Sequence, residues 1–193
     1  MSGRATVAAP RVPPPGDAGL WTFLAADIFM FGLFFLIFVW ERAQAVTAFD
    51  EARRLLDPTI GMVNTLFLLT ASWFMVGAAH AVRHRQRRAA RRHIVLAFLA
   101  GAGFGVLKLS EYAGKIAAGI TMLTSDFFTY YFVFTGVHFL HFIGGMVMLV
   151  VLFLRLGTAR EGEVIWTESI ASYWHMVDLL WLMLFPMLYL MRV

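Results

Sequence analysis

The sequence predicts an all-α integral membrane protein, built as a bundle of five transmembrane helices. Two features of its composition indicate this fold class. Of the 193 residues, 60% are hydrophobic and 15% are charged, whereas soluble domains carry about 45–50% apolar and about 25% charged residues. The third observation is a series of five separate apolar segments, each long enough for the roughly 20 helical residues that cross a hydrocarbon core.

The predicted helices follow one another in a single membrane domain, residues 19–193. They cover residues 20–40, 60–82, 93–116, 126–156 and 170–191. Inside a bilayer each segment must satisfy its own backbone hydrogen bonds, which an α-helix does within one segment. Residues 1–18 contain four of the six prolines and no apolar run, so we expect a disordered cytoplasmic tail there. Apolar side chains at helical spacing in residues 45–56 predict a further short helix on the outer membrane surface.

The basic side chains indicate how the bundle is oriented. Ten arginines lie in the tail and in the connections on one face: Arg4, Arg11, Arg83, Arg85, Arg87, Arg88, Arg91, Arg92, Arg155 and Arg160. Fewer basic residues lie on the other face. Because basic connections face the cytoplasm, we expect the N-terminus inside and the C-terminus outside. This placement accounts for the net charge of +4 without a nucleic-acid partner.

Charged side chains inside the apolar segments are the most informative, since one near the bilayer centre costs about 2.5–3.5 kcal/mol and usually faces the bundle interior. Asp27 lies in the first segment, and Asp178 lies in the last, three residues after His175. Asp27 allows two interpretations: a proton-handling site, or an acid that locks two helices together by hydrogen bonds. The spacing of His175 and Asp178 favours an intrahelical, structural pair.

The third apolar segment carries Glu111 near its outer end. This acid can pair with Lys115 at i,i+4 or with Lys108 at i,i+3, which predicts a salt-bridged helix end. Other interior residues are expected to hydrogen-bond or pack between helices: Asn64, Thr65, Ser72, Thr135, His138, His141, Trp174, Trp181, Gly101 and Gly105.

The fourth segment places Thr135, His138 and His141 on one helix face. Neutral imidazole is the commonest metal ligand, so one interpretation is a haem held between His138 or His141 and a histidine of a facing helix, such as His80 or His175. The alternative is that both rings form hydrogen bonds to backbone carbonyls or to serine and threonine on neighbouring helices.

Soluble-enzyme chemistry is absent from the sequence. There is no cysteine, which excludes disulfides, thiolate metal sites and iron–sulfur clusters. There is also no glycine-rich phosphate loop, zinc-protease helix or nucleophile elbow. Any chemistry therefore belongs to the bilayer or to a partner chain.

Four motifs in order along the chain resemble those of subunit III of haem–copper oxidases. Residues 64–72 are similar to the family's NTxxLLxSS segment, and residues 110–112 to its EY element. Residues 134–144 resemble its TGxHxxHxxxG helix, and residues 173–181 its YWHxVDxxW helix. The likeness spans residues 17–192. Typical subunit III has seven helices, so the chain is most similar to the short, five-helix branch associated with nitric oxide reductases.

The resemblance implies a subunit of the bacterial cytoplasmic membrane that carries no redox centre or metal itself. Such a subunit packs beside a haem-bearing catalytic subunit, which would hold the haem and the copper or iron. It also binds structural phospholipid and supports proton uptake. The family's buried acid, usually glutamate preceded by serine, corresponds to Asp27 preceded by Ala26. The shorter side chain reduces the reach of any proton relay.

The sequence is compatible with three functions. The favoured one is a non-catalytic subunit of a haem–copper oxidase or nitric oxide reductase complex. A b-type cytochrome membrane anchor would instead carry a bis-histidine haem of its own. A small proton-coupled transporter would require a substrate-sized cavity and commonly shows repeats or broken helices.

Overall fold

A computed structural model describes residues 18–157 and 162–191 of the chain. The predicted tail therefore lies almost wholly outside the described residues. The helices are α1 (Ala18–Gln44), α2 (Val46–Arg53), α3 (Pro58–Arg83), α4 (Arg87–Ala117), α5 (Asp126–Arg155) and α6 (Glu163–Phe185), and α6 continues into the π-helix η1 (Pro186–Leu190). Five of them are long and apolar enough to cross a membrane. The predicted five-helix membrane bundle is confirmed.

Two predicted helix starts were placed too late. Helix α4 begins at Arg87 rather than at residue 93, and α6 begins at Glu163 rather than at residue 170. Apolar content marks the part of a helix that lies in the hydrocarbon, but arginine and glutamate are also good helix formers. Both helices therefore extend beyond their apolar segments into the polar region at the membrane surface.

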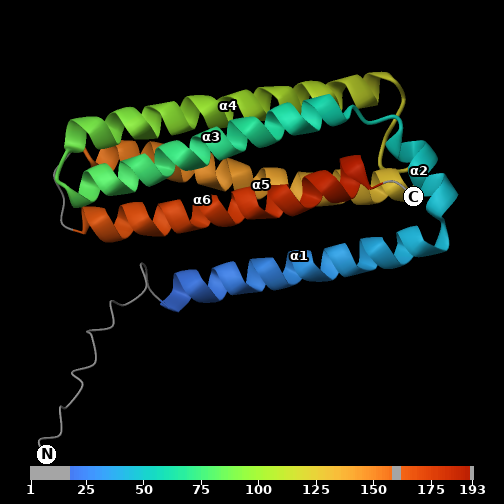
Figure 1. Cartoon of the computed structure of the whole chain (residues 1–193), viewed down its shortest axis with the longest axis horizontal. Coiled ribbons are helices and arrows are strands. Elements are labelled where there is room, and N and C mark those ends of the chain that lie inside the picture. Colours follow the sequence, from blue (N-terminus) through green and yellow to red (C-terminus); the bar gives the residue numbers. More distant parts are fainter. Residues whose placement is uncertain (1–17, 158–161, 192–193) are drawn as a thin grey trace, which may run out of the picture.

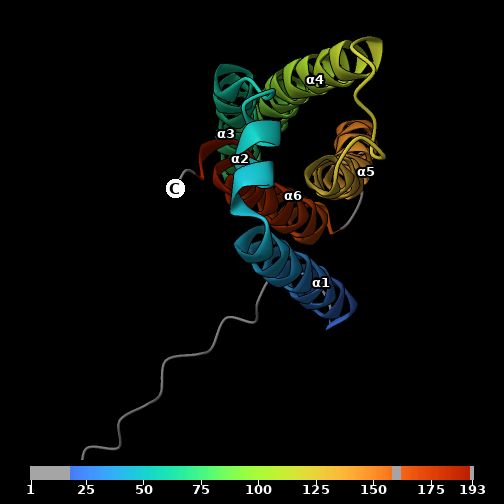
Figure 2. The same ribbon diagram turned by 90° about the vertical axis from the view of Figure 1, so that its right-hand side faces the viewer.

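Helices α3, α4, α5 and α6 form the body of the bundle, and α1 lies along one side of it (Figures 1 and 2). The most extensive contact joins α3 to α4, and α6 packs against both α3 and α5, whereas α4 and α5 touch more lightly. Helix α1 joins α5 through aromatic rings, including Phe34 stacked on Phe134 with centroids 5.3 Å apart. The core is thus centred on α6, whose spanning segment is the most deeply buried of the five.

The short helix α2 confirms the predicted helix between the first two spans. Phe49 and Ala52 are buried, and the Phe49 ring contacts the rings of Phe38 on α1 and Phe127 on α5. These buried residues of α2 therefore cover the ends of α1 and α5, and its position on the outer membrane surface stays a prediction.

The two ends of the bundle differ in charge. One end holds the start of α1, the α3–α4 turn and the end of α5, together with the arginines of residues 83–92; we call it the arginine end. The other holds α2, the α4–α5 connection and the last residues described, and we call it the α2 end (Figure 1). The first and last described residues thus lie at opposite ends.

Candidate functional site

Polar side chains inside the apolar bundle form three separate groups. The Lys108 cluster consists of Lys108, Glu111, Tyr112, Tyr131, Thr135 and Tyr189. A second group is the Asp27–His141 pair, and the third is the His175 group, made of Ser72, His175 and Asp178. Each group joins residues from different helices.

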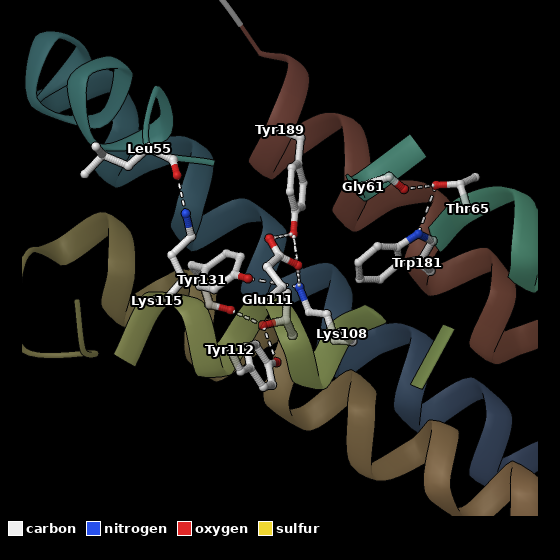
Figure 3. A network of polar contacts seen from close by, with 11 residues as sticks. Leu55, Gly61, Thr65, Lys108, Glu111, Tyr112, Lys115, Tyr131, Trp181 and Tyr189 are labelled. Atoms are coloured by element: carbon white, nitrogen blue, oxygen red, sulfur yellow. Dashed lines mark hydrogen bonds and ion pairs between the residues drawn. The ribbon is translucent and has the colours of Figure 1, made fainter. Parts of the chain in front are cut away.

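The Lys108 cluster lies where α4, α5 and η1 meet (Figure 3). Lys108 is fully buried. An ammonium group has three protons to donate, and Lys108 Nζ donates to Glu111 Oε2 at 2.9 Å and to the hydroxyls of Tyr131 and Tyr189 at 3.0 Å each. The Tyr189 hydroxyl in turn donates to the Glu111 carboxylate at 2.8 Å. The buried charge is therefore paired and its donors are fully used.

The structure selects one of the two predicted partners of Glu111. Lys108 pairs with Glu111, while Lys115 reaches the backbone carbonyl of Leu55 instead (Figure 3). Thr135 extends the cluster, because it accepts a hydrogen bond from the Tyr112 hydroxyl at 2.7 Å. The sequence predicted a salt bridge at the end of a helix. The structure places this salt bridge in a buried hydrogen-bond network that joins α4 to α5 and η1.

Two tyrosines that complete this cluster, Tyr131 and Tyr189, were not predicted from the sequence. Tyr189 reaches Lys108 because α6 continues as a π-helix from Pro186. Proline lacks a backbone N–H, so it disturbs the hydrogen-bond ladder at that point, and π turns are frequent at functional sites. Pro186 within the last apolar segment was the available signal.

The second group joins α1 to α5. His141 Nε2 lies 3.1 Å from Asp27 Oδ2, without the alignment of a good hydrogen bond. His141 Nδ1 lies 2.9 Å from the carbonyl oxygen of Val137. A carbonyl only accepts, so Nδ1 carries a proton and the Nε2 of a neutral ring has a lone pair toward Asp27. The contact between His141 Nε2 and Asp27 Oδ2 is favourable when one of the two side chains carries an additional proton.

Aromatic side chains enclose this pair. The rings of Phe23 and Phe31 lie 6.5 and 5.9 Å from the His141 ring, and the Tyr173 hydroxyl donates to the backbone carbonyl of His141 at 2.9 Å. Asp27 itself is only 8% exposed. The contact connects α1 to α5, as one interpretation of Asp27 predicts, and the proton-handling interpretation stays a prediction.

His138 and His141 do not share a site, although both lie on the predicted face of α5. His138 is fully buried, and its Nε2 lies 3.1 Å from the carbonyl oxygen of Val177 on α6. The ring packs between those of Phe104 and Trp181. With His138 turned toward α6 and His141 toward α1, this geometry favours hydrogen bonding over haem ligation. Within residues 18–157 and 162–191, no three histidine or acidic side chains gather as a metal site.

The third group contains the predicted intrahelical pair in α6 and adds a partner from another helix. His175 Nδ1 lies 2.6 Å from the Ser72 hydroxyl on α3 but 4.0 Å from Asp178 Oδ2. The main partner of His175 is therefore on another helix, because the ring is turned toward α3. The Asp178 carboxylate is buried and makes no hydrogen bond to any residue that the structure describes.

Other predicted interior residues hold α3 and α6 together. Trp181 Nε1 donates to the Thr65 hydroxyl at 3.0 Å, and Thr65 donates to the carbonyl of Gly61 (Figure 3). Asn64 is fully buried on the same helix, yet its side-chain amide has no hydrogen-bond partner among the described residues. Thr65 therefore hydrogen-bonds between helices as predicted, whereas Asn64 is buried there without a hydrogen bond from its side chain.

The glycines of α4 make room for side chains of α5 and α6 rather than for another backbone. A β-carbon at Gly101 would lie 2.8 Å from the sulfur of Met146 and 3.2 Å from the ring of the fully buried Trp174, and one at Gly105 would lie 3.3 Å from the ring of Phe142. The sequence predicted that these glycines let two helix backbones approach closely. In the structure they instead accommodate side chains of α5 and α6.

The sequence is similar to those of known proteins along almost its whole length. The family model described as cytochrome c oxidase subunit III matches residues 16–193. The quinol oxidase subunit 3 of Bacillus subtilis is 28% identical over 178 residues, which covers 90% of this chain and 85% of the relative. The cytochrome c oxidase subunit 3 of Corynebacterium diphtheriae is 27% identical, covering 100% of this chain and 96% of the relative. A probable cytochrome c oxidase subunit 3 of Mycobacterium tuberculosis is also 27% identical, with 91% and 88% covered.

Proposed function

Since the chain belongs to the cytochrome c oxidase subunit III family, we propose that it supports the assembly and the proton uptake of a respiratory oxidoreductase complex without being its catalytic subunit. The observation that carries this function is the family match, which spans residues 16–193. The bacterial relatives and the five apolar helices make the chain a multi-pass bacterial membrane protein.

The haem and metal centres of the complex belong, in this proposal, to a partner catalytic subunit. In the described part of the chain, His138, His141 and His175 already engage Val177, Val137 and Ser72, which leaves a poor donor set for a haem between helices. The test is purification in mild detergent. A haem-bearing subunit should co-purify, whereas the chain expressed alone should show no stoichiometric haem absorbance. A full complement of haem in the isolated chain would support the b-type cytochrome anchor instead.

The arginine end of the bundle is proposed to face the cytoplasm. Residues 83, 85, 87, 88, 91 and 92 are all arginine, and Arg155 lies at the same end. Since positively charged connections remain inside, a membrane-impermeant label should modify a cysteine placed in the α4–α5 connection from outside and one in the α3–α4 turn only after lysis. The chain contains no native cysteine to interfere.

Asp27 is the residue to which we assign a proton-handling role. Its contact with His141 requires a proton on one of the two partners to be favourable, and the enclosing rings of Phe23 and Phe31 limit access of water. In the intact complex, Asp27→Asn should lower turnover and proton uptake, and Asp27→Glu should restore them in part. Asp126→Asn, at the start of α5, serves as a matched control. Unchanged proton uptake in Asp27→Asn would leave only the helix-joining role.

Oxygen and nitric oxide both remain as terminal acceptors of the complex. The relatives compared above are named as oxidase subunits, while residues 64–73 resemble the nitric oxide reductase-associated branch. The catalytic subunit that co-purifies decides between them through its acceptor in a turnover assay.

His175 and Asp178 are proposed to fix α6 for assembly. The 2.6 Å contact between His175 and Ser72 joins α6 to α3. Ser72→Ala and Asp178→Ala should therefore loosen association with the catalytic subunit in detergent, and Thr22→Ala, on the exposed start of α1, should not. We also propose that structural phospholipid is a partner of the chain.

A further inference from the structure

Two histidines lie side by side at the end of α3, where the chain turns toward α4 at the arginine end of the bundle (Figure 1). His80 and His84 are spaced i,i+4, and the backbone N–H of His84 donates to the carbonyl of His80 at 3.2 Å. Their ring centroids are 4.4 Å apart, and the ring planes are tilted by 52°. Both residues are exposed, so the two imidazoles form an accessible pair on one face of the helix.

The rings of His80 and His84 have no polar partner in the part of the chain that the structure describes. Neither ring makes a hydrogen bond or an ion pair with a described residue. The interior histidines differ, because His138, His141 and His175 each place a ring nitrogen within 3.1 Å of a protein oxygen. The nitrogens of the exposed pair therefore remain available to a ligand.

The separation of the two rings suits a metal ion that both of them bind. A transition metal lies about 2.1 Å from an imidazole nitrogen, which puts it about 3.2 Å from the ring centroid. Two rings bound at a right angle then have centroids about 4.5 Å apart, and two bound at the tetrahedral angle about 5.2 Å apart. The observed distance of 4.4 Å matches the right angle, which Cu²⁺ and Ni²⁺ prefer.

The chemistry and the position of the pair also favour a transition metal. Two histidines at i,i+4 on one helix face supply paired ligands in known metal sites, and imidazole suits copper, nickel and zinc. Magnesium and calcium prefer oxygen ligands instead. The pair lies at the C-terminus of α3, where the carbonyl dipoles of a helix favour a cation.

The arginines near the pair oppose a cation, but two of them have acidic partners. Arg83 pairs with Glu168 at 2.6 Å, and Arg87 pairs with Glu163 at 3.3 Å. These carboxylates offset part of the positive charge around His84. Because imidazole binds a metal through the lone pair of a neutral nitrogen, the pair does not need an excess of negative charge around it.

We propose that His80 and His84 bind one divalent transition-metal ion, with Cu²⁺ held most tightly and water in the remaining coordination positions. Nitrogen ligands in general follow the order Ni²⁺ < Cu²⁺ > Zn²⁺, and the right-angle geometry adds to the preference for Cu²⁺ over Zn²⁺. The alternative is that the two rings only stack on each other, since aromatic pairs pack at similar distances.

The proposed site goes beyond the proposed function and does not depend on it. It lies at the surface of the bundle, apart from the three interior groups, and adds no redox centre to the chain. The family resemblance implies a chain without any metal, and the proposal departs from that expectation at this pair alone.

The test uses the complex that contains this chain, purified through a tag without histidine and freed of loosely bound ions with EDTA. Cu²⁺, Ni²⁺, Zn²⁺ or Mg²⁺ is titrated in, and binding is measured by isothermal titration calorimetry. The unmodified complex should bind one Cu²⁺ more tightly than His84→Gln does, by at least about tenfold, and Mg²⁺ should show no such difference. The electron paramagnetic resonance difference spectrum between Cu²⁺-loaded and metal-free complex should show coupling to two imidazole nitrogens.

Matched variants separate the metal site from general effects. His93→Gln removes another histidine of the same end, whose ring lies against Gly77 on α3, and should leave the Cu²⁺ affinity unchanged. His84→Cys supplies a thiolate and should restore the Zn²⁺ binding that His84→Gln loses. Equal Cu²⁺ affinity of the unmodified and His84→Gln complexes, coupling to fewer than two imidazoles, or binding only at millimolar Cu²⁺ would overturn the proposal.

The full chain purified alone in the same detergent provides a second preparation for this titration. Failure of a haem-bearing subunit to co-purify with the chain would overturn the proposed function, and the titration of the chain alone would still decide the metal site. Normal co-purification of that subunit without the additional Cu²⁺ would overturn the metal site alone.

Discussion

The buried Lys108–Glu111 pair gives the sharpest prediction about stability. The two side chains are 1% and 3% exposed, and the carboxylate accepts from both Lys108 and Tyr189. In Glu111→Gln the new amide can still accept from Tyr189, but no anion faces the ammonium group. Removing one partner of a buried ion pair costs about 3–5 kcal/mol, which in a chain of this size lowers Tm by roughly 10 °C.

Removing both charges should cost less than the two single changes added together. In Lys108→Met/Glu111→Met no charge is left in the interior, and replacing a buried pair by apolar side chains of similar size is often nearly neutral. The remaining cost comes from the hydroxyls of Tyr131 and Tyr189, which lose their partners; each unsatisfied buried group costs about 1–3 kcal/mol. The double variant should therefore unfold at a higher temperature than the sum of the two single variants predicts.

The assay is thermal unfolding of the purified complex in one detergent, followed by circular dichroism, for the wild type, Lys108→Met, Glu111→Met and the double variant, with Glu111→Gln measured alongside them. A coupling energy of several kcal/mol supports the reasoning. A Glu111→Gln variant that unfolds at the wild-type temperature would refute this reasoning, and so would purely additive effects of the single variants. Either result would mean that Glu111 does not stabilise the buried ammonium group of Lys108.

Two further predictions concern packing and helix capping. Gly145→Ala places a β-carbon 2.9 Å from the Trp174 ring and should destabilise by about 1–3 kcal/mol, whereas Gly32→Ala, which meets nothing within 4 Å, should not; equal unfolding temperatures would contradict this. The Thr59 N–H, 2.8 Å from the Asp57 carboxylate, lowers the pKa of Asp57. The stabilisation from Asp57 is therefore fully present above the ordinary value of about 3.9 and is lost as the pH falls below it, so Asp57→Asn should flatten the unfolding profile below about pH 4.

Features that depend on local sequence could be predicted. Five apolar runs produced five spanning helices, since the bilayer imposes the helical backbone on each run. The sequence predicted that Glu111 pairs with a lysine at helical spacing. The choice of Lys108 over Lys115 depended on the tyrosines that contact Lys108.

Features that depend on how helices dock could not be predicted. Asp27 has no basic neighbour in its own segment, and its partner His141 becomes known only once α1 lies against α5. Likewise, His175 has Asp178 three residues away, yet its ring contacts Ser72 on α3. Asp27 thus has its partner on another helix, and His175 has an interhelical partner in addition to its local partner Asp178.

The two histidines of α5 show why helix periodicity alone does not define a site. At 3.6 residues per turn, positions three apart differ by about 60° around the helix axis. That rotation is small enough to place His138 and His141 on one face of an isolated helix. Where α5 meets both α1 and α6, however, it directs His138 to Val177 and His141 to Asp27. A haem site built from both histidines would require a single helix facing this side of α5. Because two helices pack there, the spacing of three residues directs one histidine to α6 and the other to α1.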